Sequence, residues 1–191
     1  ELIHEEDYGE ITTKCTQYLN NTEVDGFLFK YYHFYGDYDH YFRDHCWYPH
    51  EIRIVRNDPE IHSFADAQSF RRIPNFDGKS YRQKEGTSKL NVACLNANMY
   101  HYGWVRPPKL MRKKRMYFAK AYRGDAATKL EYEKYDEGYD YGRMDYCLKF
   151  KGTHPKVLHD KIKTLDWKDV LRFSGPNVIG RPEEKHEKRK Y

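Results

Sequence analysis

Residues Tyr100–Pro108 (YHYGWVRPP) bring together side chains of types that bind anions and sugars. The segment holds the imidazole of His101, the indole of Trp104 and the guanidinium of Arg106, and the basic run Arg112–Arg115 follows it. Its two prolines predict a helix start, because a proline in the first helical turn loses no hydrogen bond. A cationic helix start behind a histidine-containing loop is typical of a site for a phosphorylated ligand. The alternative is that the cations form a solvated helix face and the aromatic rings belong to the core.

The elements expected to position this segment are a strand before it and a helix after it. Residues 90–95 (LNVACL) have the composition of a strand. After the prolines, apolar residues recur at three- and four-residue steps, which is the spacing of one helix face. These residues are Leu110, Met111, Phe118, Ala121 and Tyr122.

The rest of the chain is expected to combine further helices and strands, which favours an α/β fold. The expected elements are a helix over 5–19 with Ile11, Cys15, Tyr18 and Leu19 on one face, strands over 26–35 and 51–56, a short strand running into a loop over 61–72, and a last helix capped by Thr153 with Pro155 in its first turn.

The composition indicates a folded domain of ordinary size. The 191 residues are polar, with a mean hydropathy of -1.05, but 17% are aromatic and 19 are Tyr. Disordered chains are poor in aromatic residues, so a folded domain is favoured. The net charge is only +5, yet residues 106–123 contain eight Lys or Arg and no acid, whereas residues 131–145 contain six acids. Such clustering favours a local phosphate-binding site over a general nucleic-acid-binding surface.

Cysteine and histidine spacing excludes several site classes. The four cysteines show no CxxC spacing, so reduced buried thiols are expected rather than a zinc cluster or a disulfide framework. The loop over 36–50 contains His40, His45 and His50, but its spacing fits no metal-ligand pattern, and we expect a solvated loop. A metal hydrolase built on these residues and His33 would lack a ligand pair such as HExxH. No apolar run of membrane-spanning length and no signal peptide is visible.

Four stretches resemble, in the same order, the acceptor-side half of inverting family 2 glycosyltransferases. They are GFLFKYYHFYG (26–36), WYPHEIRIVRND (47–58), IHSFADAQSFR (61–71) and LNVACLNANMYHYGWVRPPKLMRKK (90–114). Members of this family have the GT-A fold, a mixed sheet with flanking helices that binds a nucleoside-diphosphate sugar. The resemblance covers roughly residues 1–125 and implies a metal-dependent transferase of glycan biosynthesis.

The resemblance also implies a divalent cation. Family members carry an acidic metal-binding motif at the end of a central strand, and residues 1–6 (ELIHEE) resemble those that follow its aspartate. The amino-terminal nucleotide-binding half would then be missing from this sequence. By position, Glu1 and His101 match ligands of Mn²⁺ or Mg²⁺, and the imidazole favours Mn²⁺.

Further site residues follow from the same resemblance. Inverting transfer needs a base for the acceptor hydroxyl, and Asp66 is the candidate, with Asp37 and Asp39 as rivals; a loop residue that bonds nearby amides is the alternative. Arg106 and Lys114 are expected to contact the diphosphate.

Trp104 is expected either to stack on a sugar ring of the donor or to anchor the core. The candidates for the acceptor cleft are His33, Tyr35 and Arg53. Core packing is the alternative for the first two, and a strand-end ion pair is the alternative for the arginine.

The expected organisation is a catalytic domain over 1–174, with a Tyr-rich insertion over 131–146, and a basic tail over 175–191. The tail is expected to touch an anionic surface, which would place a cytoplasmic protein at the inner face of the membrane. The expected partners are a nucleoside-diphosphate sugar and a glycan or glycolipid acceptor, not nucleic acid. Two rival functions remain: a nucleic-acid-binding module that uses residues 106–123 and stacked tyrosines, and a non-catalytic carbohydrate-binding fragment.

Overall fold

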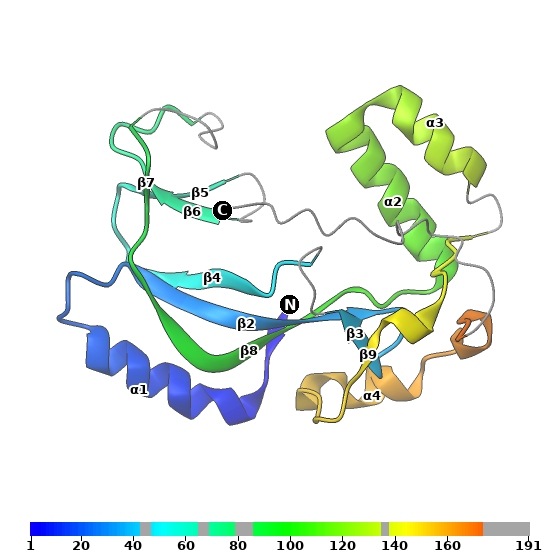
Figure 1. Cartoon of the computed structure of the whole chain (residues 1–191), viewed down its shortest axis with the longest axis horizontal. Helices are drawn as coiled ribbons and strands as arrows, with labels where there is room; N and C mark the ends of the chain where they lie inside the picture. The colour runs from blue at the N-terminus through cyan, green and yellow to red at the C-terminus, as the bar shows by residue number, and fades with distance from the viewer. Residues whose placement is uncertain (43–46, 65–68, 79–85, 135–137, 174–191) are drawn as a thin grey trace. The chain divides into compact units, whose positions relative to one another are not determined.

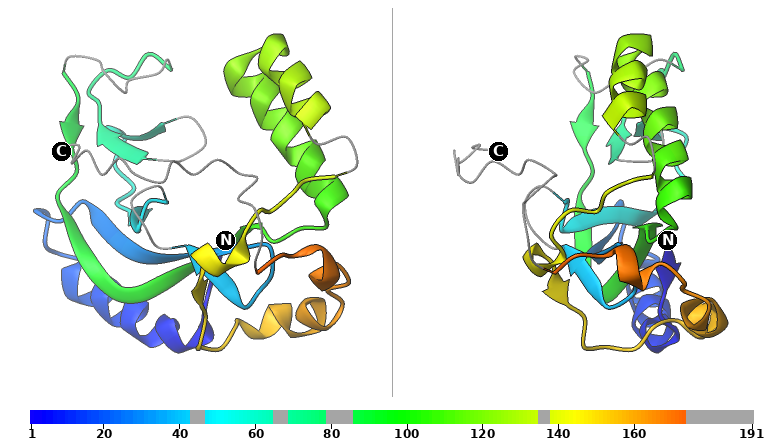
Figure 2. Two further views of the ribbon diagram at one scale, coloured as in Figure 1. Left: turned by 45° about the vertical axis from the view of Figure 1, so that its right-hand side comes forward. Right: turned by 90° about the vertical axis from the view of Figure 1, so that its right-hand side faces the viewer.

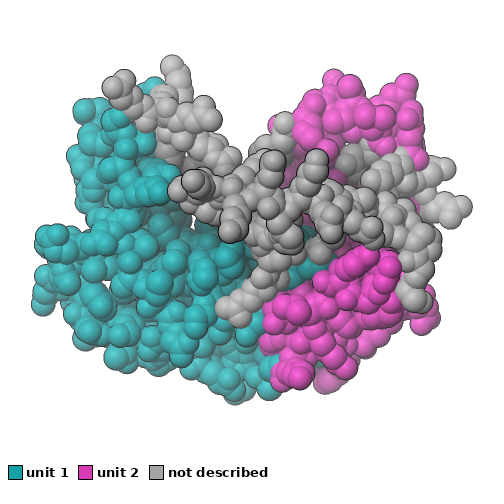
Figure 3. Space-filling view, viewed as in Figure 1, with its two compact units in different colours: residues 1–33, 42–101, 152–159 teal, residues 34–41, 102–151, 160–191 magenta. Residues whose placement is uncertain are grey.

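The computed structural model describes residues 1–42, 47–64, 69–78, 86–134 and 138–173. The chain forms two compact units, which Figure 3 colours separately. The first unit comprises residues 1–33, 42–101 and 152–159, and the second comprises residues 34–41, 102–151 and 160–191. Helices and strands are combined in the fold, so the expected α/β class is confirmed.

The first unit is built on a mixed sheet, which contains both antiparallel and parallel pairs of strands (Figure 1). β1 (Leu2–Ile3) pairs with β8 (Val92–Trp104), β8 lies beside β2 (Gly26–Tyr35), and β4 (His50–Val55) pairs with β2. A second, three-stranded sheet follows along the chain. Its strands are β5 (Ile61–Phe64), β6 (Ser69–Arg72) and β7 (Ser88–Lys89).

The core of the first unit consists of two rows of side chains on neighbouring strands. Because successive residues of a strand point to opposite faces, alternate residues form each row. The buried members are Phe27, Phe29 and Tyr31 on β2, and Leu95, Ala97 and Met99 on β8. The next alternate residue on each strand is a histidine, His33 or His101, so the two apolar rows end in imidazoles.

Helix α1 (Tyr8–Tyr18), preceded by a short 3₁₀ turn η1 (Glu5–Asp7), packs on this core through Ile11, Cys15 and Tyr18, as the sequence predicts. Leu19, expected on the same face, is instead 66% exposed, because it lies beyond the last helical residue.

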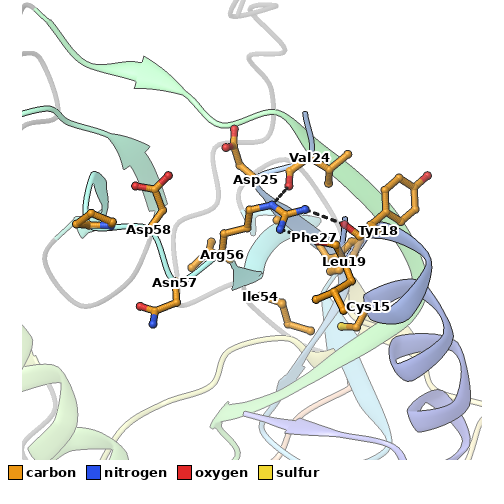
Figure 4. A pocket seen from close by; sticks show the side chains of 13 residues that line it. Cys15, Tyr18, Leu19, Val24, Asp25, Phe27, Ile54, Arg56, Asn57 and Asp58 are labelled. Atoms are coloured by element: carbon orange, nitrogen blue, oxygen red, sulfur yellow. Dashed lines mark hydrogen bonds between the residues drawn. The ribbon is translucent and has the colours of Figure 1, made fainter. Parts of the chain in front are cut away.

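Arg56, just beyond β4, closes the carboxyl end of α1 (Figure 4). Its guanidinium donates to backbone carbonyls of the last helical residue and of the segment that follows. The acceptors are the oxygens of Tyr18 (2.7 Å), Leu19 (3.1 Å), Asn21 (2.5 Å) and Val24 (2.6 Å). The last carbonyls of a helix have no partner within the helix, so a cation with several donors satisfies and stabilises this end.

In the second unit a helical hairpin follows Pro107. α2 (Pro108–Arg123) and α3 (Asp125–Lys134) lie side by side in Figures 1 and 2, joined at Gly124, whose φ is 83°. The helix start at the prolines is confirmed. Residues 131–134, expected to be irregular, belong to α3.

The remaining pieces of the chain are short. They are β3 (His40–Phe42), which pairs with β9 (Leu148–Lys149), η2 (Met144–Tyr146), η3 (Lys156–Leu158), α4 (His159–Lys163) and η4 (Lys168–Val170). The indole of Trp167 donates to the carbonyl of Gly36 over 2.8 Å, which attaches the segment after α4 to the turn after β2.

Three further expectations are corrected. β8 continues to Trp104, so the segment expected to be a loop around His101 is part of a strand. Residues 61–72 form two paired strands rather than one strand and a loop. Thr153 bonds His4 and caps no helix. Within the described part of the chain, no helix has the length and apolar character needed to cross a bilayer.

Candidate functional site

The first unit brings two predicted site residues into direct contact. His33 on β2 is fully buried, and its Nδ1 lies 3.0 Å from Nδ1 of His101 on β8. The Nε2 atom of His33 lies 2.8 Å from the carbonyl oxygen of Tyr48. The rings of Tyr31, Trp47 and Tyr48 surround His33, with centroids 4.5–5.4 Å away.

These contacts determine which ring nitrogens carry protons. A carbonyl oxygen can only accept, so Nε2 of His33 donates to Tyr48. The Nδ1 atom of a neutral His33 then holds a lone pair and accepts a hydrogen bond from Nδ1 of His101. In a neutral His101 the Nε2 atom then carries the lone pair, and imidazole in this form binds a divalent cation or accepts a proton. A donated hydrogen bond from the other ring nitrogen is what usually orients a metal-binding histidine.

Glu1 belongs to the same group because of strand register. Leu2 pairs with Tyr100 and Ile3 with Met99, so the antiparallel register places Glu1 opposite His101. When His101 is protonated, its positive charge helps to lower the pKa of Glu1. Glu1 and His101, predicted as metal ligands from positions 100 residues apart, therefore lie on neighbouring strands.

Arg53 binds Glu1 with two hydrogen bonds. Its Nε and Nη2 atoms lie 3.0 and 3.2 Å from the two carboxylate oxygens, and Nη1 lies 3.2 Å from a carboxylate oxygen of Glu51. The register of β4 against β2 passes from Ile54 to Ile52, so Arg53 is the extra residue of a β-bulge. Bulges redirect a side chain away from the regular alternation.

The pKa values of this ion pair reflect burial and mutual attraction. Burial alone would raise the pKa of Glu1, but the hydrogen bonds and charge of Arg53 bring it below its usual value. Burial would likewise lower the pKa of Arg53, and the bond to Glu1 instead raises it. Both groups are therefore charged at neutral pH, and the strand-end ion pair expected as one alternative for Arg53 is present.

Tyr31, which the sequence reading did not select, completes this group. The guanidinium of Arg53 lies 5.3 Å from the centre of its ring. Its hydroxyl is buried and lies close to the carboxylate of Glu1. Burial, with a contribution from Glu1, raises the pKa of this phenol. In the sequence, Tyr31 could have been selected because it lies two residues before His33 on the expected strand and therefore points to the same face.

The donors of this site fit a divalent cation only with help from a ligand. Glu1 supplies a carboxylate and His101 an imidazole, a combination that suits Mn²⁺. Within the described residues, however, no group of three or more His, Cys, Asp or Glu side chains is arranged around one position. The oxygens of a diphosphate and water would have to supply the remaining ligands, as they commonly do for Mg²⁺.

In the second unit, the predicted donor-binding residues gather around one indole. The ammonium of Lys114 lies 4.9 Å from the Trp104 ring and 2.7 Å from the carbonyl oxygen of Gly103. Arg115 lies 5.9 Å from the same ring, and Nε of Arg106 lies 3.4 Å from the Gly103 oxygen. Burial, with the charge of Arg106, lowers the pKa of Lys114 to about 8. An ammonium in this state gains from any anion that comes near it.

Tyr35 lies in the same unit, in the core. Its hydroxyl bonds the hydroxyl of Tyr139 (3.1 Å) and the carbonyl of Tyr141 (3.2 Å), and burial raises its pKa. The hydroxyl of Tyr141 in turn donates to the carbonyl of Arg106 over 2.6 Å. Tyr35 therefore supports the segment that carries Arg106, and its predicted contact with an acceptor stays a prediction.

A carboxylate–imidazole pair was missed in the loop expected to be solvated. Asp37 is buried, and its carboxylate oxygens lie 2.9 and 3.0 Å from Nδ1 of His40. Tyr38 between them is also buried, because the aromatic side chains of this loop pack inward. In the sequence, only the three-residue spacing of Asp37 and His40 in DYDH could have indicated this pair. Asp66 and His45 lie outside the described residues.

A cavity of about 560 Å³ lies elsewhere in the first unit, between the end of α1, the start of β2 and the end of β4 (Figure 4). Its wall is formed partly by Cys15, Tyr18 and Phe27. Both of its lining carboxylates are already engaged: that of Asp25 accepts bonds from Arg72 (2.6 Å) and the amide of Asn91 (2.8 Å), and that of Asp58 accepts a bond from Arg72 (2.8 Å). None of the predicted site residues lines this cavity.

Comparison of the chain with protein-family models, with curated proteins and with solved structures finds no match.

Proposed function

We propose that the protein is a glycosyltransferase of the GT-A fold that moves a sugar from a nucleoside-diphosphate donor to a hydroxyl of a glycan or glycolipid, with inversion. The observation that carries this proposal is the group formed by Glu1, Arg53, His33 and His101. These residues come from four segments that are distant in the sequence. The resemblance of the four ordered stretches to family 2 transferases supports the same reaction.

The proposed cation site consists of Glu1 and the Nε2 atom of His101. A bound Mn²⁺ or Mg²⁺ would neutralise the charge that develops on the diphosphate leaving group. The hydrogen-bonded chain from His101 through His33 to the Tyr48 carbonyl holds the imidazole in the required tautomer. Arg53 keeps Glu1 ionised and fixes its orientation.

The proposed donor contacts lie in the second unit. Lys114 has a lowered pKa of about 8, and its neighbour Arg106 repels its charge. A diphosphate would relieve this repulsion and restore the protonated form of the amine. The side chain of the half-buried Trp104 would then stack on the apolar face of a sugar.

Proton removal from the acceptor hydroxyl is assigned to Asp66. A carboxylate accepts this proton as the oxygen attacks the anomeric carbon, and the bond from that carbon to the diphosphate breaks on the opposite face. The Asp37–His40 pair has the same chemical capacity, and Asp37 remains the rival base.

Nucleotide binding tests the cation site. Because these residues are assigned to the diphosphate, titration of the purified protein with inorganic diphosphate and with nucleoside diphosphates in the presence of Mn²⁺, monitored by calorimetry, should show metal-dependent binding. His101→Ala should weaken it at least tenfold, whereas His159→Ala, at an exposed histidine outside the site, should leave it unchanged. Equal affinity of the wild type and His101→Ala would remove His101 from the ligands.

Turnover tests the reaction itself. A panel of nucleotide sugars is supplied with Mn²⁺, and release of nucleoside diphosphate is measured with and without glycan and glycolipid acceptors. Asp66→Asn should abolish acceptor-dependent release while nucleotide binding persists. Unchanged release in Asp66→Asn, with loss in Asp37→Asn, would transfer the role of base to Asp37. Absence of nucleotide binding and of release across the panel would refute the proposed function.

A further inference from the structure

The exposed face of α2 has a composition unlike that of an ordinary solvated helix. Residues 108–123 contain seven Lys or Arg and no Asp or Glu. Cations near the amino terminus of a helix are unfavourable, because the partial charge there is already positive. Lys109 and Lys113, four residues apart, also repel one another. The positive charges near the start of α2 therefore do not stabilise the helix itself.

The cations and the apolar side chains of this helix form two adjoining stripes. Successive helical residues are turned by about 100°, so residues three, four, seven and eleven apart share a face. Lys109, Lys113 and Lys120 form one stripe, and all three are exposed. Leu110 and Tyr117, seven residues apart, form the stripe beside it and are 47% and 71% exposed.

The lysines of this face have no ion pair in the part of the chain that the structure describes. Lys109, Lys113 and Lys120 are not engaged by any acidic side chain there. The opposite side of α2 is packed, since Met111 and Ala119 are fully buried. The hairpin is also braced, because the guanidinium of Arg112 lies 4.3 Å from the centre of the Tyr132 ring on α3. The two stripes are therefore presented by a supported helix.

We propose that this face of α2 docks the protein on an anionic lipid surface. Lysines attract acidic headgroups, while Leu110 and Tyr117 enter the boundary between headgroups and acyl chains. Lysine side chains suit this position because their long stems keep the charge in the headgroup layer while the helix lies flat. A nucleic acid would satisfy the charges but would leave the exposed leucine without an apolar partner. The proposal is independent of the transferase reaction and concerns a surface other than the tail over 175–191.

Flotation with lipid vesicles tests the proposal on the whole chain. The wild type should float with vesicles of phosphatidylcholine and phosphatidylglycerol and not with phosphatidylcholine alone. The triple variant Lys109→Ala, Lys113→Ala, Lys120→Ala should bind about a hundredfold more weakly, at roughly fivefold per lysine. The double variant Leu110→Ser, Tyr117→Ser should bind at least tenfold more weakly, because the charges remain but the inserted apolar area is lost.

A matched triple variant controls for net charge. Lys89→Ala, Lys151→Ala, Lys161→Ala removes the same three charges from exposed lysines outside α2 and should bind within about twofold of the wild type. Circular dichroism and urea unfolding of each variant should match the wild type, since every replaced side chain is exposed. Equal weakening by both triple variants, or wild-type binding by the α2 variants, would overturn the proposal. Binding of a single-stranded oligonucleotide in place of vesicles would also overturn it.

Discussion

Replacing Arg53 with Met should reverse the way in which Glu1 couples the free energy of unfolding to pH. In the wild type the pKa of folded Glu1 lies below its usual value of 4.5. Between these two values the unfolded chain binds more protons than the folded one, so stability rises with pH. The contribution of Glu1 is complete above about pH 4.5 and is lost as the pH falls through the folded pKa.

The variant keeps the burial of Glu1 but removes its hydrogen bonds and its counter-charge. Burial then raises the folded pKa above 4.5, and the folded chain binds more protons than the unfolded one. The pH dependence contributed by Glu1 therefore changes sign. In the variant, the free energy of unfolding is highest below about pH 4.5 and falls as the pH rises through the raised pKa of folded Glu1.

The size of the effect follows from the burial of the pair. The side chains of Arg53 and Glu1 are 16% and 32% exposed, so the pair is neither fully exposed nor fully buried. Exposed pairs contribute up to about 1 kcal/mol, and breaking a buried pair costs about 3–5 kcal/mol. We therefore expect a loss of about 2 kcal/mol at neutral pH and a smaller loss at acid pH, where Glu1 is protonated in both proteins.

Urea unfolding followed by circular dichroism across a pH series measures this difference. The double variant Glu1→Gln, Arg53→Met should lack the pH-dependent part of the stability change, because residue 1 then has no side-chain carboxyl to titrate. A difference between wild type and Arg53→Met that is the same at acid and neutral pH would refute the reasoning.

Three other experiments have expected outcomes. Arg56→Met removes the four guanidinium hydrogen bonds at the end of α1 and should lower the free energy of unfolding by about 3 kcal/mol in urea denaturation, whereas Arg56→Lys should recover part of it. The amine of Lys114 should titrate with a midpoint near its pKa of about 8, so pH-dependent acylation followed by mass spectrometry should label it before other lysines. Because that pKa is lowered in the fold, stability should rise with pH from about 8 upward, until the lysines of the unfolded chain have also lost their protons. Gly36→Ala should destabilise by about 2–3 kcal/mol, because φ is 74° and the added carbon would lie 2.7 Å from the terminal methyl of Met144; an unchanged melting temperature would contradict it.

Local signals in the sequence predicted most of the elements. The strand over 26–35, the helix start after two prolines and the packed face of the first helix all follow from side-chain periodicity and capping rules. The α/β class followed from these elements. The same local rules missed the extension of β8 to Trp104, because a segment rich in Tyr, His and Gly has no clear period.

The candidate site was predicted only as a set of residue types. Its members meet through strand register, which no local pattern determines. His33 and His101 are 68 residues apart, and Glu1 and Arg53 are 52 apart. The bulge that directs Arg53 toward Glu1 leaves no mark in the alternation of its strand. Asp66, the predicted base, lies outside the described residues, so that assignment stays a prediction.

The attachment of Arg56 to the end of α1 has a consequence for the order of folding. An eleven-residue helix is too short to persist alone in water. The carbonyl of Tyr18 accepts a bond from the nearby amide of Asn21, but its side-chain donor is Arg56, which lies 38 positions later in the chain. The full set of hydrogen bonds at this helix end therefore forms only when the helix and the segment after β4 come together, so we expect α1 to gain much of its stability late in synthesis, once that arginine has emerged.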